Sequence, residues 1–209
     1  MNAIKIMVKG WVKVLPFYLF TLLPLFVSCG DDSEEANEFD NWVEQNDAVI
    51  SQWAGSNSYQ KIKSYTKDQA VAGKNSDYIY VRVVESGVGT ESPIFNDTVR
   101  VAYRLRYIPT KSYPDGIMVG ETYIGEFNWK TINVSNLALG NSLIDGFSTA
   151  VMNMHAGDRW IVNIPYQLAY GNPSTNDGIL DGSNLVYDLA LVDFWHPGET
   201  RPSFKSREK

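Results

Sequence analysis

Cysteine and histidine are scarce in this 209-residue chain, which contains one Cys and two His. A single cysteine excludes an intramolecular disulfide, a CxxC redox pair and a metal site built from several thiolates. Two histidines leave little basis for a zinc site or a histidine-based proton relay. A phosphate-binding glycine loop with lysine and a basic stripe are also missing, so nucleotide and nucleic-acid functions have no support. We therefore predict no cofactor and no metal.

The remaining composition is that of an ordinary globular protein. Apolar residues make up 44% of the chain and charged residues 20%, with 9 Pro and 16 Gly. These values exclude a disordered or collagen-like chain. The length suits one domain plus additional segments.

The first 28 residues have the pattern of a signal peptide. Three lysines precede an apolar run at 14–27 (VLPFYLFTLLPLFV), which contains two prolines and is shorter than the roughly 20 apolar residues of a spanning helix. Residues 25–29 (LFVSC) resemble the lipobox of bacterial lipoproteins, which predicts that Cys29 becomes the lipidated first residue. The alternative, an uncleaved anchor helix with an incidental cysteine, is disfavoured by the short, proline-broken run.

Cleavage before Cys29 would leave an acidic protein on a lipid anchor. Residues 1–28 hold three lysines and no acidic residue, so their removal changes the formal net charge from −6 to −9. An acidic surface argues against nucleic acid as a partner. Residues 29–37, with four acids at 30–35, are predicted to form a solvated tether. We expect an extracytoplasmic location in the bacterial cell envelope, favouring the outer membrane, with the exposed membrane face left open.

Residues 38–76 are predicted to form a helical extension and linker. Apolar positions between 39 and 53 follow helical spacing, and residues 54–56 (AGS) end the pattern. The polar stretch 57–76 is interpreted as a linker or a second short helix. Packing of the apolar helix face on its own domain is favoured over a dimer contact.

Residues 77–195 are predicted to form an α+β domain with an antiparallel sheet of about five strands around one short helix. Alternating apolar residues predict strands at 78–84, 98–108, 160–164 and 184–194. Phe127 and Trp129 indicate a further strand by the same alternation. The helix is expected to follow Asp145 as a cap and to end before Gly157. Residues 196–209 are expected to form a flexible tail.

Six motifs along this domain carry a family resemblance. They are residues 97–103 (DTVRVAY), 143–147 (LIDGF), 154–159 (MHAGDR), 164–165 (IP), 168–171 (LAYG) and 184–188 (NLVYD). In this order they resemble the FK506-binding (FKBP-type) peptidyl-prolyl isomerases over about residues 77–194. The resemblance implies an FKBP-like twisted antiparallel sheet wrapped around a short helix, and activity on proline-containing polypeptide segments of extracytoplasmic proteins.

The resemblance also implies the site residues. Tyr103, Ile144 and Tyr170 are expected to carry catalysis, with the Ile144 backbone N–H holding a substrate carbonyl and the Tyr170 hydroxyl donating a second hydrogen bond. The expected substrate-binding residues are Val119, Phe127, Trp129, Leu143, Phe147 as the pocket floor, Ile179 in the overhanging loop, and Tyr187. Inward aromatic residues on strands are by themselves more typical of a core. The motif order favours a site for the three catalytic positions and leaves Leu143 and Trp129 open between the two interpretations.

The chemistry explains why no nucleophile or metal is needed. Rotation about an X-Pro bond is slow because the amide has partial double-bond character, with a barrier of about 18–20 kcal/mol. A dry aromatic pocket that holds the proline ring disfavours the planar, charge-separated resonance form. Each reduction of the barrier by about 1.4 kcal/mol raises the rate tenfold.

Two positions depart from the family pattern in a way that we expect to lower the rate of isomerisation. Val119 stands where the family has a pocket Phe, and Gly120 stands where it has an Asp that hydrogen-bonds ligands. Glu121 is adjacent, but a shift of one residue along a strand points a side chain to the opposite face. We therefore expect a slow isomerase. The alternatives are a proline-binding chaperone or scaffold without turnover, and a structural module in which residues 36–76 mediate assembly.

Overall fold

One antiparallel sheet of seven strands organises the computed structural model, which describes residues 37–201 and 203. Two α-helices and two 3-10 helices accompany the sheet within these residues. The elements are α1 Trp42–Gly55, β1 Gln60–Lys63, η1 Asn75–Asp77, β2 Tyr78–Glu85, β3 Thr98–Tyr107, β4 Met118–Glu121, β5 Ser135–Ala138, α2 Asp145–Val151, β6 Arg159–Ile164, η2 Tyr166–Leu168 and β7 Leu185–Trp195.

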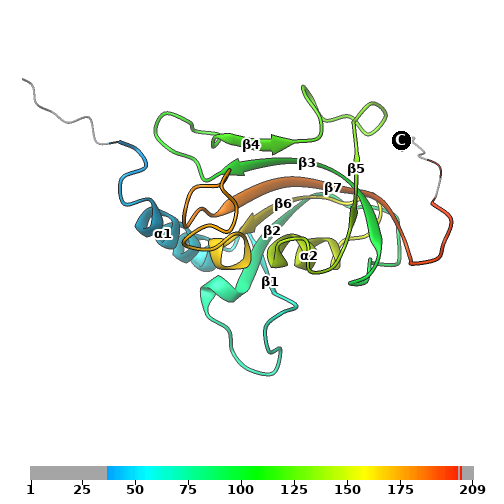
Figure 1. The fold of residues 1–209 in the computed structure, drawn as a ribbon, viewed down its shortest axis with the longest axis horizontal. Coiled ribbons are helices and arrows are strands. Elements are labelled where there is room, and N and C mark those ends of the chain that lie inside the picture. The colour runs from blue at the N-terminus through cyan, green and yellow to red at the C-terminus, as the bar shows by residue number, and fades with distance from the viewer. Residues whose placement is uncertain (1–36, 202, 204–209) are drawn as a thin grey trace, which may run out of the picture. The chain divides into compact units, whose positions relative to one another are not determined.

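The strands run in the order β1-β2-β6-β7-β3-β4, and β5 pairs with β3 beside this path. The curved sheet holds α2 against one face, as Figure 1 shows. This arrangement confirms the predicted α+β class, with an antiparallel sheet around a short helix, and the long strands β2, β3, β6 and β7. The three short strands β1, β4 and β5 were not predicted, so the sheet has seven strands where about five were expected.

Helix α2 lies unusually close to the sheet at Gly146. A Cβ atom built on Gly146 would lie 2.3 Å from Ile164 Cγ2 of β6, so only glycine allows this approach. The next residue, Phe147, is thereby fixed in the core with 3% of its surface exposed. Asp145 is not the cap that was predicted: Ile144 occupies the N-cap position, and Asp145 is the first helical residue.

Helix α1 packs on its own domain, as was favoured. Its buried Trp42, Ile50 and Trp53 join the main hydrophobic core with the inward side chains of the sheet. The following segment forms neither a simple linker nor a second α-helix over its length. Residues 60–63 pair with β2 instead and become the edge strand β1.

The opposite face of the sheet carries a second, smaller core. Ala102 of β3 and Ala190 of β7 lie on this face, because neighbouring side chains on a strand alternate between faces. Tyr123, Trp129 and Ile132 pack against them from the irregular segment 122–134. The strand predicted from Phe127 and Trp129 is therefore wrong: the two aromatics dock onto the sheet from a loop and do not extend it.

Some predictions concern parts of the chain that the structure does not describe. The proposed signal peptide, Cys29 and residues 29–36 of the acidic tether lie outside the described residues. Within the described residues, no helix is long and apolar enough to cross a membrane. At the other end, His196 Nδ1 lies 2.7 Å from the carboxylate of the buried Asp97, so the first residue of the expected tail is attached to the domain.

Candidate functional site

A pocket of about 160 Å³ opens between α2 and the inner face of the sheet. Its walls combine strands, the start of the helix and two loops. The lining residues are Tyr103 of β3, Leu137 of β5, Ser142, Leu143 and Ile144 before α2, Phe147 of α2, Tyr170 after η2, and Tyr187 of β7.

Aromatic rings dominate this pocket. The Tyr187 ring lies between two others, with its centroid 5.7 Å from that of Tyr103 and 5.5 Å from that of Phe147. The Tyr103–Tyr187 pair is edge to face with an interplanar angle of 61°, an arrangement that aromatic pairs favour, and the Phe147–Tyr187 pair is tilted at 60°. The rings therefore brace one another and form a rigid apolar wall.

Four hydrogen-bond donors at this wall have no partner among the described residues. The hydroxyls of Tyr103, Tyr170 and Tyr187, and the backbone N–H of Ile144, donate to no acceptor among residues 37–201. Burial raises the pKa of Tyr187, and the nearby Tyr170 and Tyr103 raise it further. The Tyr187 hydroxyl thus stays protonated at neutral pH. The pocket is an apolar space with unused donors at its rim.

Six of the predicted site residues come together here. They are Tyr103, Leu143, Ile144, Phe147, Tyr170 and Tyr187. Leu137 and Ser142 also line the pocket and were not predicted. Leu137 lies on β5, a four-residue strand that pairs with β3 from outside the main path and leaves no alternating signature of its own. Ser142 directly precedes Leu143, so its place next to the recognised motif was the available signal.

Two predicted pocket residues lie elsewhere. Phe127 and Trp129 belong to the small core on the opposite face of the sheet, where their ring centroids are 5.0 Å apart. The Arg159 guanidinium lies 4.0 Å from the Phe127 ring centroid, and Trp129 Nε1 donates to Glu85 at 3.1 Å. Their assignment to the pocket wall is corrected accordingly, because the sheet itself separates them from the pocket.

Val119 and Ile179 also lie outside the pocket lining. Val119 is half-buried against the main core on β4. Ile179 is 8% exposed and faces a separate groove between α1 and the loop at residues 171–183. The structure therefore brings neither residue into contact with the pocket described above.

Comparison with known proteins identifies the family. Residues 89–192 match the profile of the FKBP-type peptidyl-prolyl cis-trans isomerases. The chain belongs to this family. It is similar to peptidyl-prolyl cis-trans isomerase FKBP9 of Homo sapiens (32% identical over 127 residues, 60% of this chain and 20% of that protein) and to FKBP-type peptidyl-prolyl cis-trans isomerase FkpA of Escherichia coli K12 (28% over 131 residues, 63% and 43%).

The fold has the same relatives. The crystal structure of FkpA from Escherichia coli superposes with a TM-score of 0.55 at 26% identity, covering 77% of this chain and 62% of that one. The chain thus spans less than half the length of both curated relatives named above.

Gly120 of β4 stands at the position where the family resemblance leads us to expect an aspartate. Gly120 pairs with Leu105 of β3, and a Cβ atom built on it would meet no atom within 4 Å. Glu121 pairs with Arg104, whose Nε lies 3.2 Å from its carboxylate. Because directly paired residues share a face, Glu121 lies with the arginines of the opposite face, as the register argument predicts. Glu121 is therefore no substitute for the family's aspartate.

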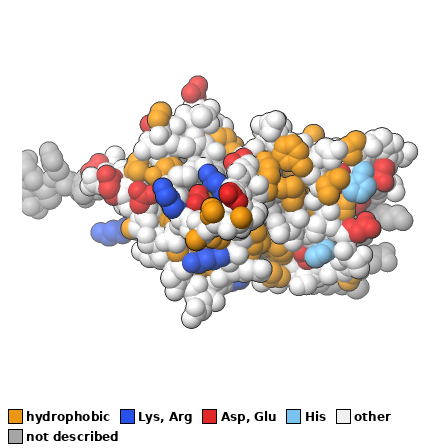
Figure 2. All heavy atoms as spheres, turned by 90° about the horizontal axis from the view of Figure 1, so that it is seen from below, with side chains coloured by type: hydrophobic (Ala, Val, Ile, Leu, Met, Phe, Trp, Pro, Cys, Tyr) orange, Lys and Arg blue, Asp and Glu red, His pale blue; other side chains and the backbone are white. Residues whose placement is uncertain are grey.

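Charges elsewhere on the FKBP-type domain suggest no other chemistry. Within the described residues, no group of three or more His, Cys, Asp or Glu side chains is placed to hold a metal ion. Figure 2 shows basic and acidic side chains intermixed on one face, without a continuous area of one sign. The pocket remains the site with the clearest chemical character.

Proposed function

We propose that this chain is a peptidyl-prolyl cis-trans isomerase that acts on proline-containing segments of polypeptides. The observation that carries the proposal is the aromatic pocket with unpaired donors at its rim. A binding site of this kind combines an apolar interior with a few polar groups that fix orientation. The proline ring is apolar and rigid, and the amide before it carries carbonyl acceptors, so both parts of the ligand match the pocket.

The geometry suggests how catalysis proceeds. The proline ring packs on Phe147 between Tyr103 and Tyr187, which displaces water from the X-Pro amide. Loss of water disfavours the planar, charge-separated amide and so favours the twisted transition state. The Ile144 N–H and the Tyr170 hydroxyl hold carbonyls on either side of the bond, which leaves the bond itself free to rotate.

We further propose that the domain at 77–195 works outside the cytoplasm, attached to the membrane through a lipid on Cys29 and the tether 29–37. The support is the lipobox-like segment 25–29 after a short apolar run. The slow steps that proline imposes on folding chains give such an enzyme its substrates. Mass spectrometry of the membrane-extracted protein tests this: a diacyl or triacyl modification on Cys29 is expected, and an unmodified Met1 start contradicts it.

A second candidate function is proline binding without turnover. Its support is Gly120, which leaves the pocket without the carboxylate that the family uses, together with Val119 outside the pocket lining. Such a domain would hold proline segments as a chaperone or scaffold. We favour the isomerase because the desolvating wall is intact, and we expect a slow rate.

A protease-coupled isomerisation assay on a proline tetrapeptide separates the two functions. The protein is the chain from residue 30 onward, which retains the compact unit at 36–209. A catalysed rate that falls in a Tyr170→Phe, Phe147→Ala variant establishes an isomerase. A rate equal to buffer, with proline-peptide binding retained by calorimetry, selects the binding module.

A further inference from the structure

Helix α1 contacts the loop next to the pocket through polar side chains that are fully buried. Asn46, with none of its surface exposed, lies in the middle of α1. The Oδ1 atom of Asn46 accepts a hydrogen bond from the backbone N–H of Asn184 at 2.8 Å. The backbone carbonyl of Asn46 accepts one from Asn184 Nδ2 at 2.7 Å. Asn184 in turn accepts the N–H of Tyr166 at 2.9 Å. One buried pair of amides thus joins α1 to the start of η2 and the start of β7.

These two attachment points enclose a segment that contains Tyr170 of the pocket lining. Tyr166 opens the stretch that leads to Tyr170, and Asn184 closes the flap loop, which we define as residues 171–183. Three residues after Asn184 stands Tyr187. Figure 1 shows the flap loop beside α1. Asn46 is therefore connected to Tyr170 and Tyr187 through only a few residues of chain, so its position bears on the positions of both tyrosines.

Further contacts hold the flap loop to the same helix. Trp42 Nε1 donates to the Ser183 hydroxyl at 2.7 Å, and both groups are buried. Gly182 has φ +63°, and a Cβ atom there would lie 2.7 Å from Val43 Cγ2. The Tyr107 hydroxyl accepts the N–H of Leu180 at 2.9 Å. The loop is thus held by α1 at two points, Ser183 and Gly182, and by Tyr107 of β3 at a third.

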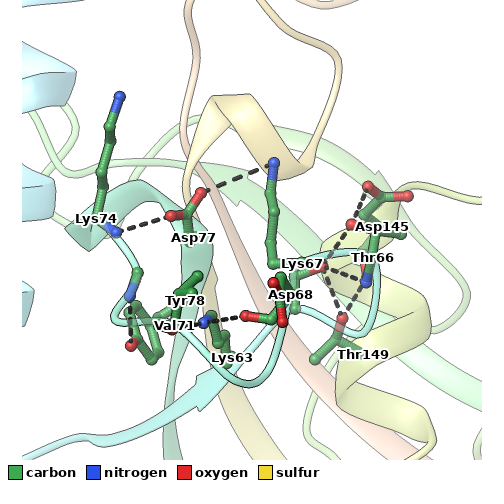
Figure 3. A network of polar contacts seen from close by, with 12 residues as sticks. Lys63, Thr66, Lys67, Asp68, Val71, Lys74, Asp77, Tyr78, Asp145 and Thr149 are labelled. Carbon is green, nitrogen blue, oxygen red and sulfur yellow. Dashed lines mark hydrogen bonds and ion pairs between the residues drawn. The ribbon is translucent and has the colours of Figure 1, made fainter.

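The rest of the extension reaches the other side of the pocket. The Thr66 hydroxyl donates to the Asp145 carboxylate at 2.8 Å (Figure 3). Thr149 Oγ1 accepts the N–H of Tyr65 at 3.3 Å. Asp145 directly follows Ile144, which lines the pocket. Residues 38–76 therefore contact both elements between which a substrate would lie.

A helix that only covered the sheet would need no buried amide. Apolar packing by Trp42, Ile50 and Trp53 already supplies that role. Buried polar groups contribute little net stability, but a fully satisfied network fixes one arrangement. We propose that α1 positions the flap loop and Tyr170 for catalysis, with Asn46 as the positioning residue. This inference rests on the proposed isomerase function.

The test compares two variants of α1 in the chain from residue 30 onward. Asn46→Ala removes the acceptor for the Asn184 N–H, whereas Ile50→Ala removes only core packing from the same helix. We expect Asn46→Ala to lower kcat/KM about tenfold at a temperature where the protein is fully folded, because small misplacements of catalytic groups have large effects. Ile50→Ala is expected to lower the melting temperature and to leave kcat/KM within about twofold of the unsubstituted chain.

Amide hydrogen exchange supplies a second measurement. A local change in exchange rate in the flap loop is not expected if Asn46 only stabilises the fold. Asn46→Ala should raise exchange of the Leu180, Gly182 and Asn184 amides at least about tenfold and leave those of β3 and β7 unchanged. If Asn46→Ala folds poorly, Ser183→Ala replaces it, since it removes only the Trp42 partner, with about threefold effects expected. Unchanged kcat/KM and exchange in these variants, or an equal loss of kcat/KM in Ile50→Ala, would overturn the proposal.

Failure of the proposed function is recognised separately. If the unsubstituted chain shows no turnover, the isomerase proposal fails, and hydrogen exchange alone decides the role of α1. Faster exchange confined to residues 180–184 in Asn46→Ala then supports positioning of the loop. Exchange equal to that of the unsubstituted chain overturns it.

Discussion

Both faces of the sheet carry clustered aromatic side chains, but those of the inner face line a pocket and those of the outer face form a small core. On the inner face, the rings of Tyr103, Phe147 and Tyr187 pack together around a pocket, and the two tyrosine hydroxyls have no partner among the described residues. On the outer face, Phe127 and Trp129 also pack edge to face. Aromatic content alone therefore does not distinguish a binding site from a core.

The difference lies in the polar groups beside the rings. On the outer face, Arg159 makes two hydrogen bonds to Asp188, at 2.8 and 2.7 Å, and stacks on Phe127. Arg104 pairs with Glu121 and lies over Tyr123. These groups are satisfied within the protein, and they fix the 122–134 segment. The inner face leaves its donors for a ligand, which is the physical signature of a site.

The largest expected effect comes from replacing one phenylalanine on each side of the sheet with alanine. Phe147→Ala should lower kcat/KM at least about a hundredfold and the free energy of unfolding by about 3–5 kcal/mol, because it opens the pocket floor. Phe127→Ala should lower the free energy of unfolding by about 1–2 kcal/mol through lost packing and cation–π contact. Urea denaturation and assays well below the unfolding transition measure both. Equal losses of kcat/KM in the two variants would contradict the comparison.

Removing a single hydroxyl from each side of the sheet gives a finer test of the comparison between the two faces. Tyr170→Phe should lower kcat/KM about tenfold and leave stability within about 0.5 kcal/mol, since the hydroxyl has no partner among residues 37–201. Tyr123→Phe removes a 3.3 Å hydrogen bond to Asp188 and should lower the free energy of unfolding by about 0.5–1 kcal/mol with unchanged kcat/KM. A Tyr170→Phe variant with full activity would remove the hydroxyl from the mechanism.

Restoring the missing carboxylate tests the inner face from the other direction. Gly120→Asp places a side chain in open space on the face of Leu105, so we expect a severalfold rise in kcat/KM with little change in stability. Glu121→Gln, one residue along, weakens the Arg104 ion pair and should lower the free energy of unfolding by less than about 1 kcal/mol. If Glu121→Gln reduces kcat/KM, then Glu121 reaches the pocket and our register argument is wrong.

The smallest effect is expected at the end of the sheet, away from both faces. The hydrogen bond from His196 to the Asp97 carboxylate raises the pKa of the imidazole above its usual value. The protonated form is thus favoured in the folded protein, and the stabilisation is present below about pH 6.5 and lost as pH rises through the raised pKa. Melting temperatures from pH 5 to 9 should fall slightly more for the unsubstituted chain than for His196→Gln. Parallel curves would show that the contact contributes nothing.

Local patterns in the sequence were sufficient for much of the fold. The alternation at 98–108 predicted β3, and the interval from Asp145 to Gly157 predicted α2. The order of the recognised motifs predicted that Tyr103, Phe147, Tyr170 and Tyr187 share one pocket, and the structure brings them together there from separate elements. These residues stand in long regular strands or in recognised motifs, which is why local patterns brought them together, and their roles stay a prediction.

The failures share a different cause. The segment 60–63 (QKIK) is polar and forms a strand only because β2 offers it a partner. Phe127 and Trp129 alternate as strand residues do, but contacts with Ala102 and Ala190, distant in the sequence, decide which face they occupy. The role of Asn46 was equally hidden, since its partner Asn184 lies 138 residues away. Such features depend on non-local pairing, which a single sequence does not display.

The short edge strand β1 has a consequence for a protein whose proposed substrates are incompletely folded chains. An exposed sheet edge offers unpaired backbone groups on which an extended chain can add itself as a further strand, the first step of aggregation. Here the outermost strand has four residues and carries Lys61 and Lys63, and the other end of the sheet is the four-residue β4. Both edges are thus short, and one carries two lysines, which disfavours the addition of a further strand.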